Sequence, residues 1–405
     1  MKLAVNTGCS LIILLSLSLC FTARGEVRLP RLISDGMVIQ RDVAVTIWGW
    51  AGVNETVAVR FHGKVYTAKS SVDGKWSVAL SPVKAGGPYD LTIEAGNTIT
   101  IKNILVGDVW VCSGQSNMAL PMERVKERYP DVIAQANNPA IRHFFLSTQY
   151  NFKHKQDDVT SGTWEPANPT SVLKFSAVAY FFAKSLYEKY HVPIGLVNAS
   201  VGGSPAEAWL SADALKNFPE AWKEAQRFSN DQVIDSILTA ERLRNTQWYN
   251  NLRRADEGYK GEKPWHDVNY IPADWSTMPV PGYWSDRGIK MNGVVWFRKE
   301  VDIPASMTGK PAKLFLGCIV DSDSVYINGK FAGSIGYRYP PRRYELPAGL
   351  LKPGKNVIVI RVINNAGKGG FVEDKSYAIV SEKESVNLQG DWQYKIGAIA
   401  DPLPA

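Results

Sequence analysis

The chain has 405 residues, 45% of them hydrophobic, and a formal net charge of +7. Because this length exceeds one ordinary hydrophobic core, we expect two or three domains. The composition excludes a disordered protein, and the basic residues form no tract with interleaved aromatic side chains, so nucleic acid is not expected as a partner.

The first 25 residues have the pattern of a secretory signal peptide. Lys2 supplies a positive start, Leu11–Phe21 forms an apolar run, and Ala23–Gly25 offers small residues for cleavage. The apolar run is too short to span a bilayer comfortably, and no other stretch could span one. We therefore expect a secreted or periplasmic protein without a membrane span. The alternative for residues 1–25 is a buried N-terminal helix.

Residues 26–103 alternate short strand-like segments with turn signals. Segments rich in β-branched and aromatic residues occur at 45–49, 57–61, 76–80 and 91–94. Asp73-Gly74 and Gly86-Gly87 mark turns between them. This pattern predicts a small antiparallel β-sandwich.

Residues 104–271 change to the pattern of a parallel α/β layer. The run Ile104–Cys112 is nearly continuous in apolar residues, which is typical of a strand buried on both faces. Residues 175–190 follow a helical period that places Phe175, Val178, Phe182 and Leu186 on one face. Residues 192–197 form a second apolar strand, and this order predicts a parallel sheet. We expect the polar, helical residues 211–256 on the outside of this domain.

Residues 272–392 are again rich in strand signals. Strand-like segments occur at 294–301, 313–316, 325–327 and 357–362. Asn328-Gly329, between two such segments, is a strong hairpin signal. We expect a second β-sandwich here, followed in residues 393–405 by the start of a return to the α/β domain.

The sharpest chemical feature is the segment Gly114-Gln115-Ser116-Asn117-Met118, directly after the first α/β strand. A serine at the carboxyl end of a parallel strand lies where ligand sites form in α/β proteins. The free N–H groups at the start of a following helix can hold a developing oxyanion. The alternative is that Ser116 only caps that helix.

A second turn, Val201-Gly202-Gly203-Ser204, follows the second α/β strand. A Gly-Gly turn allows backbone N–H groups to approach a ligand closely. The alternative is an ordinary turn between a strand and a helix. Because the carboxyl ends of parallel strands share one edge of the sheet, we expect the two turns to face one crevice.

These segments carry a resemblance to a known family. Residues 107–118 (GDVWVCSGQSNM) resemble the first block of the sialate O-acetylesterase family of the SGNH-hydrolase superfamily, and residues 192–209 resemble its second block. Residues 293–362 resemble the sugar-binding β-sandwich found beside β-galactosidase-like catalytic domains. The resemblance implies an SGNH-type parallel α/β sheet layer, flanked by an N-terminal β-sandwich and an inserted jelly-roll-like, galactose-binding-like β-sandwich.

The resemblance also implies a function. It implies a serine esterase that removes O-acetyl groups from sialic acid or related sugars through an acyl-enzyme. Ser116 would be the nucleophile, and the backbone N–H groups of Ser116, Gly202 and Gly203 would form the oxyanion hole. The substrate pocket would be lined by Gln115, Asn117 and Glu207. No metal or organic cofactor is implied, and the partner would be an O-acetylated sugar or glycan.

One part of the family pattern is absent from this sequence. The family's later blocks carry an Asp-x-x-His pair, but none of the five histidines has an aspartate three residues before it. We therefore expect the chain to stop before the C-terminal catalytic block. Because a serine without a base is a poor nucleophile, the sequence leaves open whether this chain is active by itself. Two alternatives remain: an acetyl-xylan or other polysaccharide deacetylase, and a non-catalytic secreted glycan-binding protein.

Overall fold

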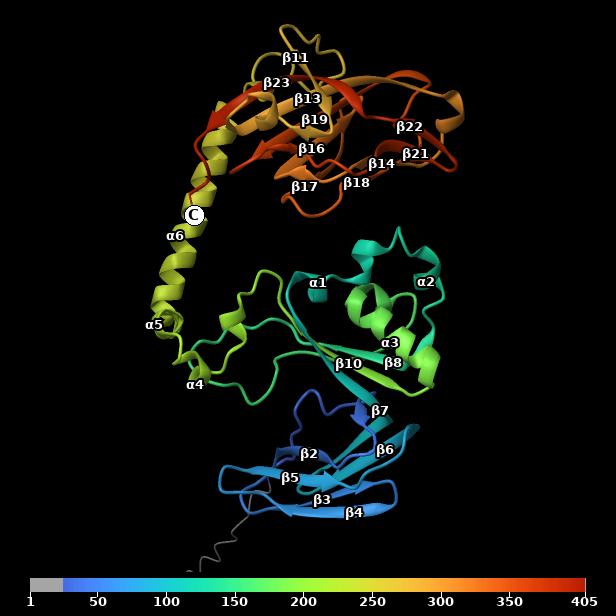
Figure 1. The fold of residues 1–405 in the computed structure, drawn as a ribbon, viewed down its shortest axis with the longest axis vertical. Helices are drawn as coiled ribbons and strands as arrows, with labels where there is room; N and C mark the ends of the chain where they lie inside the picture. The colour runs from blue at the N-terminus through green and yellow to red at the C-terminus, as the bar shows by residue number, and fades with distance from the viewer. Residues whose placement is uncertain (1–24, 405) are drawn as a thin grey trace, which may run out of the picture. The chain divides into compact units, whose positions relative to one another are not determined.

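The computed structural model describes residues 25–404, which form two compact units that meet in sequence between Ser229 and Asn230 (Figure 1). The expected signal peptide lies outside the described residues, apart from Gly25. Within residues 25–404, no helix is both long enough and apolar enough to cross a membrane.

The first unit combines short antiparallel strands with an α/β layer. Its strands are β1 (Val38–Gln40), β2 (Val45–Trp50), β3 (Thr56–Phe61), β4 (Lys64–Lys69), β5 (Lys75–Leu80), β6 (Gly86–Glu94), β7 (Thr98–Gly114), β8 (Asn138–Phe145), β9 (Trp164–Ala167) and β10 (Ile194–Ser200). Its α-helices are α1 (Ser116–Ala119), α2 (Pro130–Ala134), α3 (Ala177–Tyr190), α4 (Ala212–Leu215) and α5 (Pro219–Phe228).

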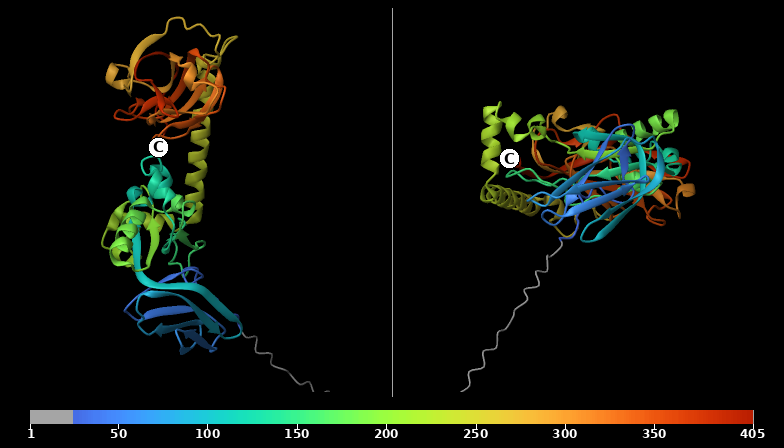
Figure 2. Two further views of the ribbon diagram at one scale, coloured as in Figure 1. Left: turned by 90° about the vertical axis from the view of Figure 1, so that its right-hand side faces the viewer. Right: turned by 90° about the horizontal axis from the view of Figure 1, so that it is seen from below.

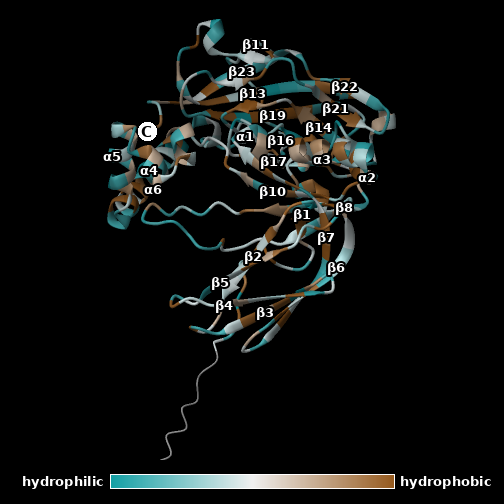
Figure 3. Ribbon diagram, turned by 60° about the horizontal axis from the view of Figure 1, so that its bottom comes forward, coloured by the Kyte–Doolittle hydropathy of each residue, from teal (hydrophilic) through white to brown (hydrophobic). Residues whose placement is uncertain are grey.

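Strand β7 passes from an antiparallel region into a parallel one. Its residues 98–106 pair antiparallel with β6, whereas residues 108–114 pair parallel with β10, which also pairs parallel with β8. The sheet order is β4-β3-β6-β7-β10-β8-β9. The expected boundary between residues 103 and 104 therefore falls inside one strand of 17 residues, which is hydrophobic along much of its length (Figure 3).

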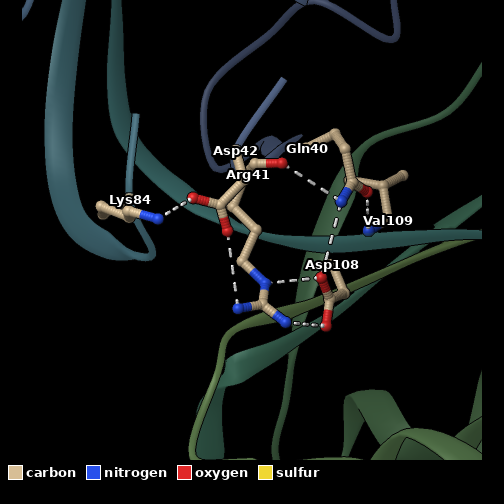
Figure 4. Close-up of polar contacts among 6 residues, drawn as sticks. All are labelled: Gln40, Arg41, Asp42, Lys84, Asp108 and Val109. Carbon is tan, nitrogen blue, oxygen red and sulfur yellow. Dashed lines mark hydrogen bonds and ion pairs between the residues drawn. The ribbon is translucent and has the colours of Figure 1, made fainter. Parts of the chain in front are cut away.

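A polar cluster lies where β7 passes from one region to the other (Figure 4). Nε of Arg41 donates to Oδ1 of Asp108 at 2.8 Å, and its Nη2 donates to Oδ2 at 3.2 Å. The N–H of Val109 donates to Oε1 of Gln40 at 2.9 Å. Because β1 pairs with residues 105–107 of β7, these bonds anchor the base of the parallel segment that leads to Ser116.

The parallel segment of β7 is less buried than its apolar sequence suggests. Residues 104–107 are buried, but the side chains of Trp110 and Val111 are 45% and 71% exposed. Strand β10 pairs with one edge of residues 108–114, and no strand within residues 25–404 pairs with the other edge. The prediction of a strand buried on both faces is therefore wrong beyond residue 107.

The helix expected over residues 175–190 forms as α3, but it buries a different face. Val178 and Phe182, expected on the apolar face, are 50% and 39% exposed. The buried side chains of the helix are Ala177, Ala179, Tyr180 and Ala183. Small side chains let a helix axis approach its neighbour closely, so side-chain size as well as hydrophobicity selects the packed face here.

Within its described residues, the second unit contains three β-sheets, two of which share one hydrophobic core, and one long helix. Its strands are β11 (Ser276–Val280), β12 (Gly282–Tyr283), β13 (Asn292–Ile303), β14 (Ala312–Leu316), β15 (Ile319–Val320), β16 (Ser322–Ile327), β17 (Lys330–Ile335), β18 (Arg343–Leu346), β19 (Gly354–Asn364), β20 (Gly370–Phe371), β21 (Tyr377–Ser381), β22 (Glu384–Asn387) and β23 (Gly390–Ala400). The long helix is α6 (Asp231–Ala255).

One hydrophobic core holds the sheets of this unit together. A sheet ordered β11-β23-β13-β19-β16-β17 and a sheet ordered β18-β14-β21-β22 both contribute to it. Phe297 from the first sheet and Leu314 from the second are fully buried. The hairpin expected at Asn328-Gly329 joins β16 to β17 and is confirmed, with φ of 50° and 79° at the two turn residues.

Helix α6 packs within the second unit, where its C-terminal part reaches the sheets (Figure 2). Leu252 is 2% exposed and belongs to a cluster with Trp296 and Val359. The Nε1 of Trp248 donates to the carbonyl oxygen of Asp401 at 2.9 Å. The expectation of one α/β domain over residues 104–271, with α6 on its outside, is therefore wrong for α6.

The expected return to the α/β domain at residue 393 is wrong, because these residues belong to strand β23 of the second unit. This strand pairs antiparallel with β13 on one side and with β11 on the other. Trp392, at its start, is 1% exposed and belongs to the core of the two sheets. Residues 390–400 therefore lie inside the larger sheet of the second unit rather than leaving it.

Candidate functional site

Ser116 lies directly beyond the carboxyl end of β7, as the first residue of α1. Gly114, the last residue of β7, has φ of 137°, which side chains other than hydrogen rarely allow. The helix begins from Gln115, and no side chain caps its start. The interpretation of Ser116 as a helix cap is therefore wrong, and its hydroxyl is exposed. Because α1 has only four residues, its dipole contributes little to the stabilisation of negative charge near Ser116.

The structure brings the turn after β10 against Ser116. The N–H of Val201 donates to the carbonyl oxygen of Gly114 at 3.0 Å, which extends the pairing of the two strands. A Cβ built on Gly202 would lie 3.6 Å from both Cα and Cβ of Ser116. The absence of a side chain at Gly202 therefore leaves space directly beside the serine.

Side chains lock the two turns together. Nε2 of Gln115 donates to the carbonyl oxygen of Ser204 at 2.8 Å. The hydroxyl of Ser204 donates to the carbonyl oxygen of Val201 at 2.7 Å and accepts from Nε1 of Trp209 at 3.0 Å. Gln115, expected to line a substrate pocket, thus uses its amide to fix the turns. The sequence did not predict that Ser204 and Trp209 would fix this turn.

Three backbone N–H groups of the site are available to a ligand. Those of Ser116, Gly202 and Gly203 donate to no acceptor within residues 25–404. Gly203 has φ of 79°, and nothing lies within 4 Å of a Cβ built on it. Preorganised N–H donors beside a nucleophile can stabilise a developing oxyanion.

Two of the expected pocket residues make no contact that ties them to this site. Asn117, in α1, is exposed, and Glu207 is exposed in the 3-10 helix Ala206–Trp209. Within the described part of the chain, neither side chain has a hydrogen bond, ion pair or ring contact. Their role in a substrate pocket remains a prediction.

No base reaches Ser116 within residues 25–404, where its Oγ makes no hydrogen bond. His143, on β8, is 2% exposed and stacks on Phe175 at 4.5 Å between ring centroids. Burial lowers its pKa to about 4, so it stays neutral near pH 7. His191 follows the C-terminal end of α3, directly before β10 begins, and β10 runs from there toward the edge where Ser116 lies.

A buried polar pair, which was not among the residues predicted from the sequence, supports the carboxyl end of β10. The hydroxyl of Ser200 donates to Oδ1 of Asn198 at 2.6 Å, and both residues are buried. Ser200 pairs in register with Gly114, so this bond lies one strand from the turn that carries Ser116. Two polar residues inside an otherwise apolar strand were the signal that could have indicated it.

Residues 106–241 match the family "Carbohydrate esterase, sialic acid-specific acetylesterase". The chain is similar to sialate O-acetylesterase of Homo sapiens (32% identity) and of Rattus norvegicus (33% identity), in each case over 47% of this chain. These matches cover 40% of the human and 38% of the rat protein, so the chain spans less than half of these relatives.

Among solved structures, the chain is similar to XAC1771, described as a novel carbohydrate acetylesterase from Xanthomonas citri. The identity is 40%, over 47% of this chain and 44% of that chain, with a TM-score of 0.46. The similarity to the sialic acid-specific acetylesterases therefore concerns residues 106–241 of the chain.

Proposed function

We propose that this chain supplies the nucleophile and the oxyanion donors of a serine esterase that removes O-acetyl groups from sialic acid or related sugars. The observation that carries the proposal is the placement of Gly202 against Ser116. A Cβ built on Gly202 would lie 3.6 Å from the Cα of Ser116. Ser116 is exposed, and the backbone N–H groups of Ser116, Gly202 and Gly203 donate to no acceptor within residues 25–404. Acyl transfer requires such a combination.

The reaction would proceed in two steps. Oγ of Ser116 attacks the acetyl carbonyl carbon, and the N–H groups of Ser116, Gly202 and Gly203 hold the oxygen that becomes negative. The bond from the carbonyl carbon to the sugar oxygen breaks, the sugar leaves as an alcohol after taking up a proton, and an acetyl-serine remains. Water then adds to that ester and releases acetate, which restores the serine.

The proton of Ser116 needs an acceptor, and the described residues offer none in contact with its Oγ. The resemblance implies an Asp-x-x-His pair in this role, and the sequence contains no such pair. The proposal therefore assigns the general base to a group outside residues 25–404. Loss of the base costs several orders of magnitude in rate, so we expect the chain alone to be slow.

The finer architecture is part of the same proposal. We assign residues 104–229 to an SGNH-type α/β layer, which the parallel order β7-β10-β8 supports. We assign the strands before residue 104 to an N-terminal β-sandwich and the two packed sheets of the second unit to a jelly-roll-like, sugar-binding sandwich. Export through a cleaved signal peptide at residues 1–25 is proposed from the sequence, and N-terminal sequencing of the protein made in a bacterial host tests it.

Chemical rescue tests the assignment of nucleophile and base together. Acetate release from O-acetylated sialic acid is measured with the full chain while free imidazole is added as a substitute base. We expect imidazole to accelerate release by the wild type but not by Ser116→Ala, with Ser113→Ala, an exposed serine on β7, behaving as the wild type. Equal acceleration of all three proteins would show that imidazole acts without Ser116 and would refute the proposal.

The same assay separates the rival substrates and functions. Faster rescue with acetylated xylan than with O-acetylated sialic acid would favour the polysaccharide deacetylase. A non-catalytic glycan-binding protein is favoured by one observation, the lack of any partner for the Ser116 hydroxyl within residues 25–404. That function predicts no Ser116-dependent release from either substrate at any imidazole concentration.

A further inference from the structure

A hollow of about 730 Å³ lies in the first unit, between the chain leading into the antiparallel strands and the long loop that joins β8 to β9. Arg28, Arg31 and Trp50 line it from the N-terminal side, and Lys155 and Asp158 line it from the loop. This volume falls within the range of small-molecule sites. Neither Ser116 nor the turn at Gly202 belongs to it, so it is distinct from the candidate esterase site.

The guanidinium of Arg28 is held in place without an acidic partner. The N–H and carbonyl of Arg28 each bond to the backbone of Trp50 at 2.9 Å. Its Cζ lies over the indole ring, 5.0 Å from the centroid. A cation over an indole face is attracted to it electrostatically, while the guanidinium N–H donors stay free for an acceptor. This preorganisation lowers the entropy that binding would lose.

The acidic residues of the hollow are already engaged. Asp157 accepts from Nζ of Lys75 at 3.0 Å. Oδ1 of Asp158 accepts from the backbone N–H of Arg31 at 3.1 Å and from that of Val159 at 2.8 Å. These bonds fix the loop against the N-terminal side and leave the carboxylates little capacity for a ligand.

The basic residues, in contrast, lack acidic partners. Within residues 25–404, the side chains of Arg28, Arg31 and Lys155 form no ion pair, and all three are exposed. The hollow is therefore lined by three cations without an acidic partner, and one of them, Arg28, lies over the half-buried indole of Trp50. Guanidinium groups bind carboxylates through paired, charge-assisted hydrogen bonds.

We propose that this hollow binds an acidic saccharide, with the carboxylate of a sialic acid unit at Arg28, Arg31 and Lys155. The proposal does not rest on the esterase function, because it concerns binding rather than acetate release. It assigns the first unit a carbohydrate-binding role separate from Ser116.

Titration calorimetry of the full chain tests the proposal, with sialyllactose as ligand and lactose as the neutral comparison. We expect sialyllactose to bind and lactose to bind about tenfold more weakly or not at all. Arg28→Ala and Lys155→Ala should each weaken sialyllactose binding about tenfold. Affinity should fall as salt rises, because exposed charges are screened.

Matched controls distinguish this site from the serine and from misfolding. Arg60→Ala, which removes an exposed pair with Glu94 at 3.1 Å, and Ser116→Ala should both retain the wild-type affinity. Lys155 lies on an exposed loop, so its substitution should not affect folding. Unchanged affinity in the Arg28 and Lys155 variants, equal affinity for lactose, or no detectable binding would each overturn the proposal. Tighter binding of a sulfated disaccharide than of sialyllactose would overturn the assignment of a carboxylate.

Discussion

Gly202 lies so close to Ser116 that a Cβ built on the glycine would be 3.6 Å from both Cα and Cβ of the serine. This is ordinary van der Waals contact, so alanine would fit there, whereas a longer side chain would extend over the hydroxyl. The two residues come from turns that follow different strands, β7 and β10, which pair in parallel up to Gly114 and Ser200. The esterase proposal depends on this adjacency.

Substitution at Gly202 should separate access to the serine from folding. We expect Gly202→Ala to retain covalent labelling of Ser116 by a fluorophosphonate, and Gly202→Leu to reduce the rate by at least about tenfold because the leucine shields the hydroxyl. Both variants should unfold at the wild-type urea midpoint, since Gly202 is exposed. Equal labelling of the leucine variant would show that Gly202 does not border the reacting face of Ser116.

Substitution of Gly203 is limited by its backbone conformation, whereas substitution of Gly202 is limited by the neighbouring Ser116. The φ of Gly203 is 79°, and a Cβ would meet nothing within 4 Å. We expect Gly203→Ala to lower the free energy of unfolding of the first unit by about 1–2 kcal/mol, the cost of left-handed backbone for a residue with a side chain. Urea unfolding measures this loss. A neutral substitution would mean that the turn can relax to another conformation.

His143 should make the first unit sensitive to acid. Its pKa is lowered to about 4 by burial, so the folded protein binds this proton less tightly than the unfolded chain does. The free energy of unfolding should therefore stay constant above pH ~6.5 and fall by up to about 3 kcal/mol between pH ~6.5 and pH ~4.

Urea unfolding across that pH range checks this dependence. His143→Phe keeps an aromatic ring against Phe175, whose stacking distance is 4.5 Å, and should remove most of the slope. His154→Gln, on an exposed loop, should retain it. If the free energy of unfolding of His143→Phe falls with pH as steeply as that of the wild type, protonation of other groups causes the pH dependence.

Asp256 should be critical for the second unit. Its fully buried carboxylate accepts from Nε of Arg361 at 2.7 Å, from Nε1 of Trp296 at 2.9 Å and from the N–H of Gly258 at 3.0 Å. Asp256→Ala would leave the buried Arg361 without its partner, so we expect a loss of about 3–5 kcal/mol in the free energy of unfolding.

The surface pair of Arg60 with Glu94, whose side chains are 55% and 41% exposed, provides the matched comparison in urea unfolding. Arg60→Ala should leave the transition of its own unit nearly unchanged, because exposed ion pairs contribute little. A small effect of Asp256→Ala would indicate that water replaces the carboxylate.

The sequence predicted those elements whose signal is local. The hairpin at Asn328-Gly329 follows from two residues that tolerate positive φ. The exposed side chains of Trp110 and Val111 could not be predicted, because their burial depends on which other segments pack over the faces of β7. Likewise, α6 is polar in sequence, and its assignment to the second unit comes from contacts between distant residues, such as the packing of Leu252 in the cluster with Trp296.

In the candidate site too, features with a local sequence signal could be predicted, and features that depend on distant residues could not. Glycine-bearing turns after two apolar strands predicted that Ser116 and Gly202 would meet, because parallel strands end at one edge of a sheet. The bond from Gln115 to the carbonyl of Ser204 could not be predicted, since it depends on the distance between two turns that are 89 residues apart in the chain. The sequence carries no Asp-x-x-His pair, and within residues 25–404 no side chain bonds to Oγ of Ser116.

The most direct test of the central proposal compares two exposed serines in one protein. The full chain is treated with a fluorophosphonate, and the labelling rates of Ser116 and Ser113 are measured by peptide mass spectrometry. Because the N–H groups of Ser116, Gly202 and Gly203 donate to no acceptor within residues 25–404, the proposal predicts faster labelling of Ser116 than of Ser113, with the difference growing as imidazole is added. Labelling of Ser116 no faster than of Ser113 would contradict its assignment as the nucleophile.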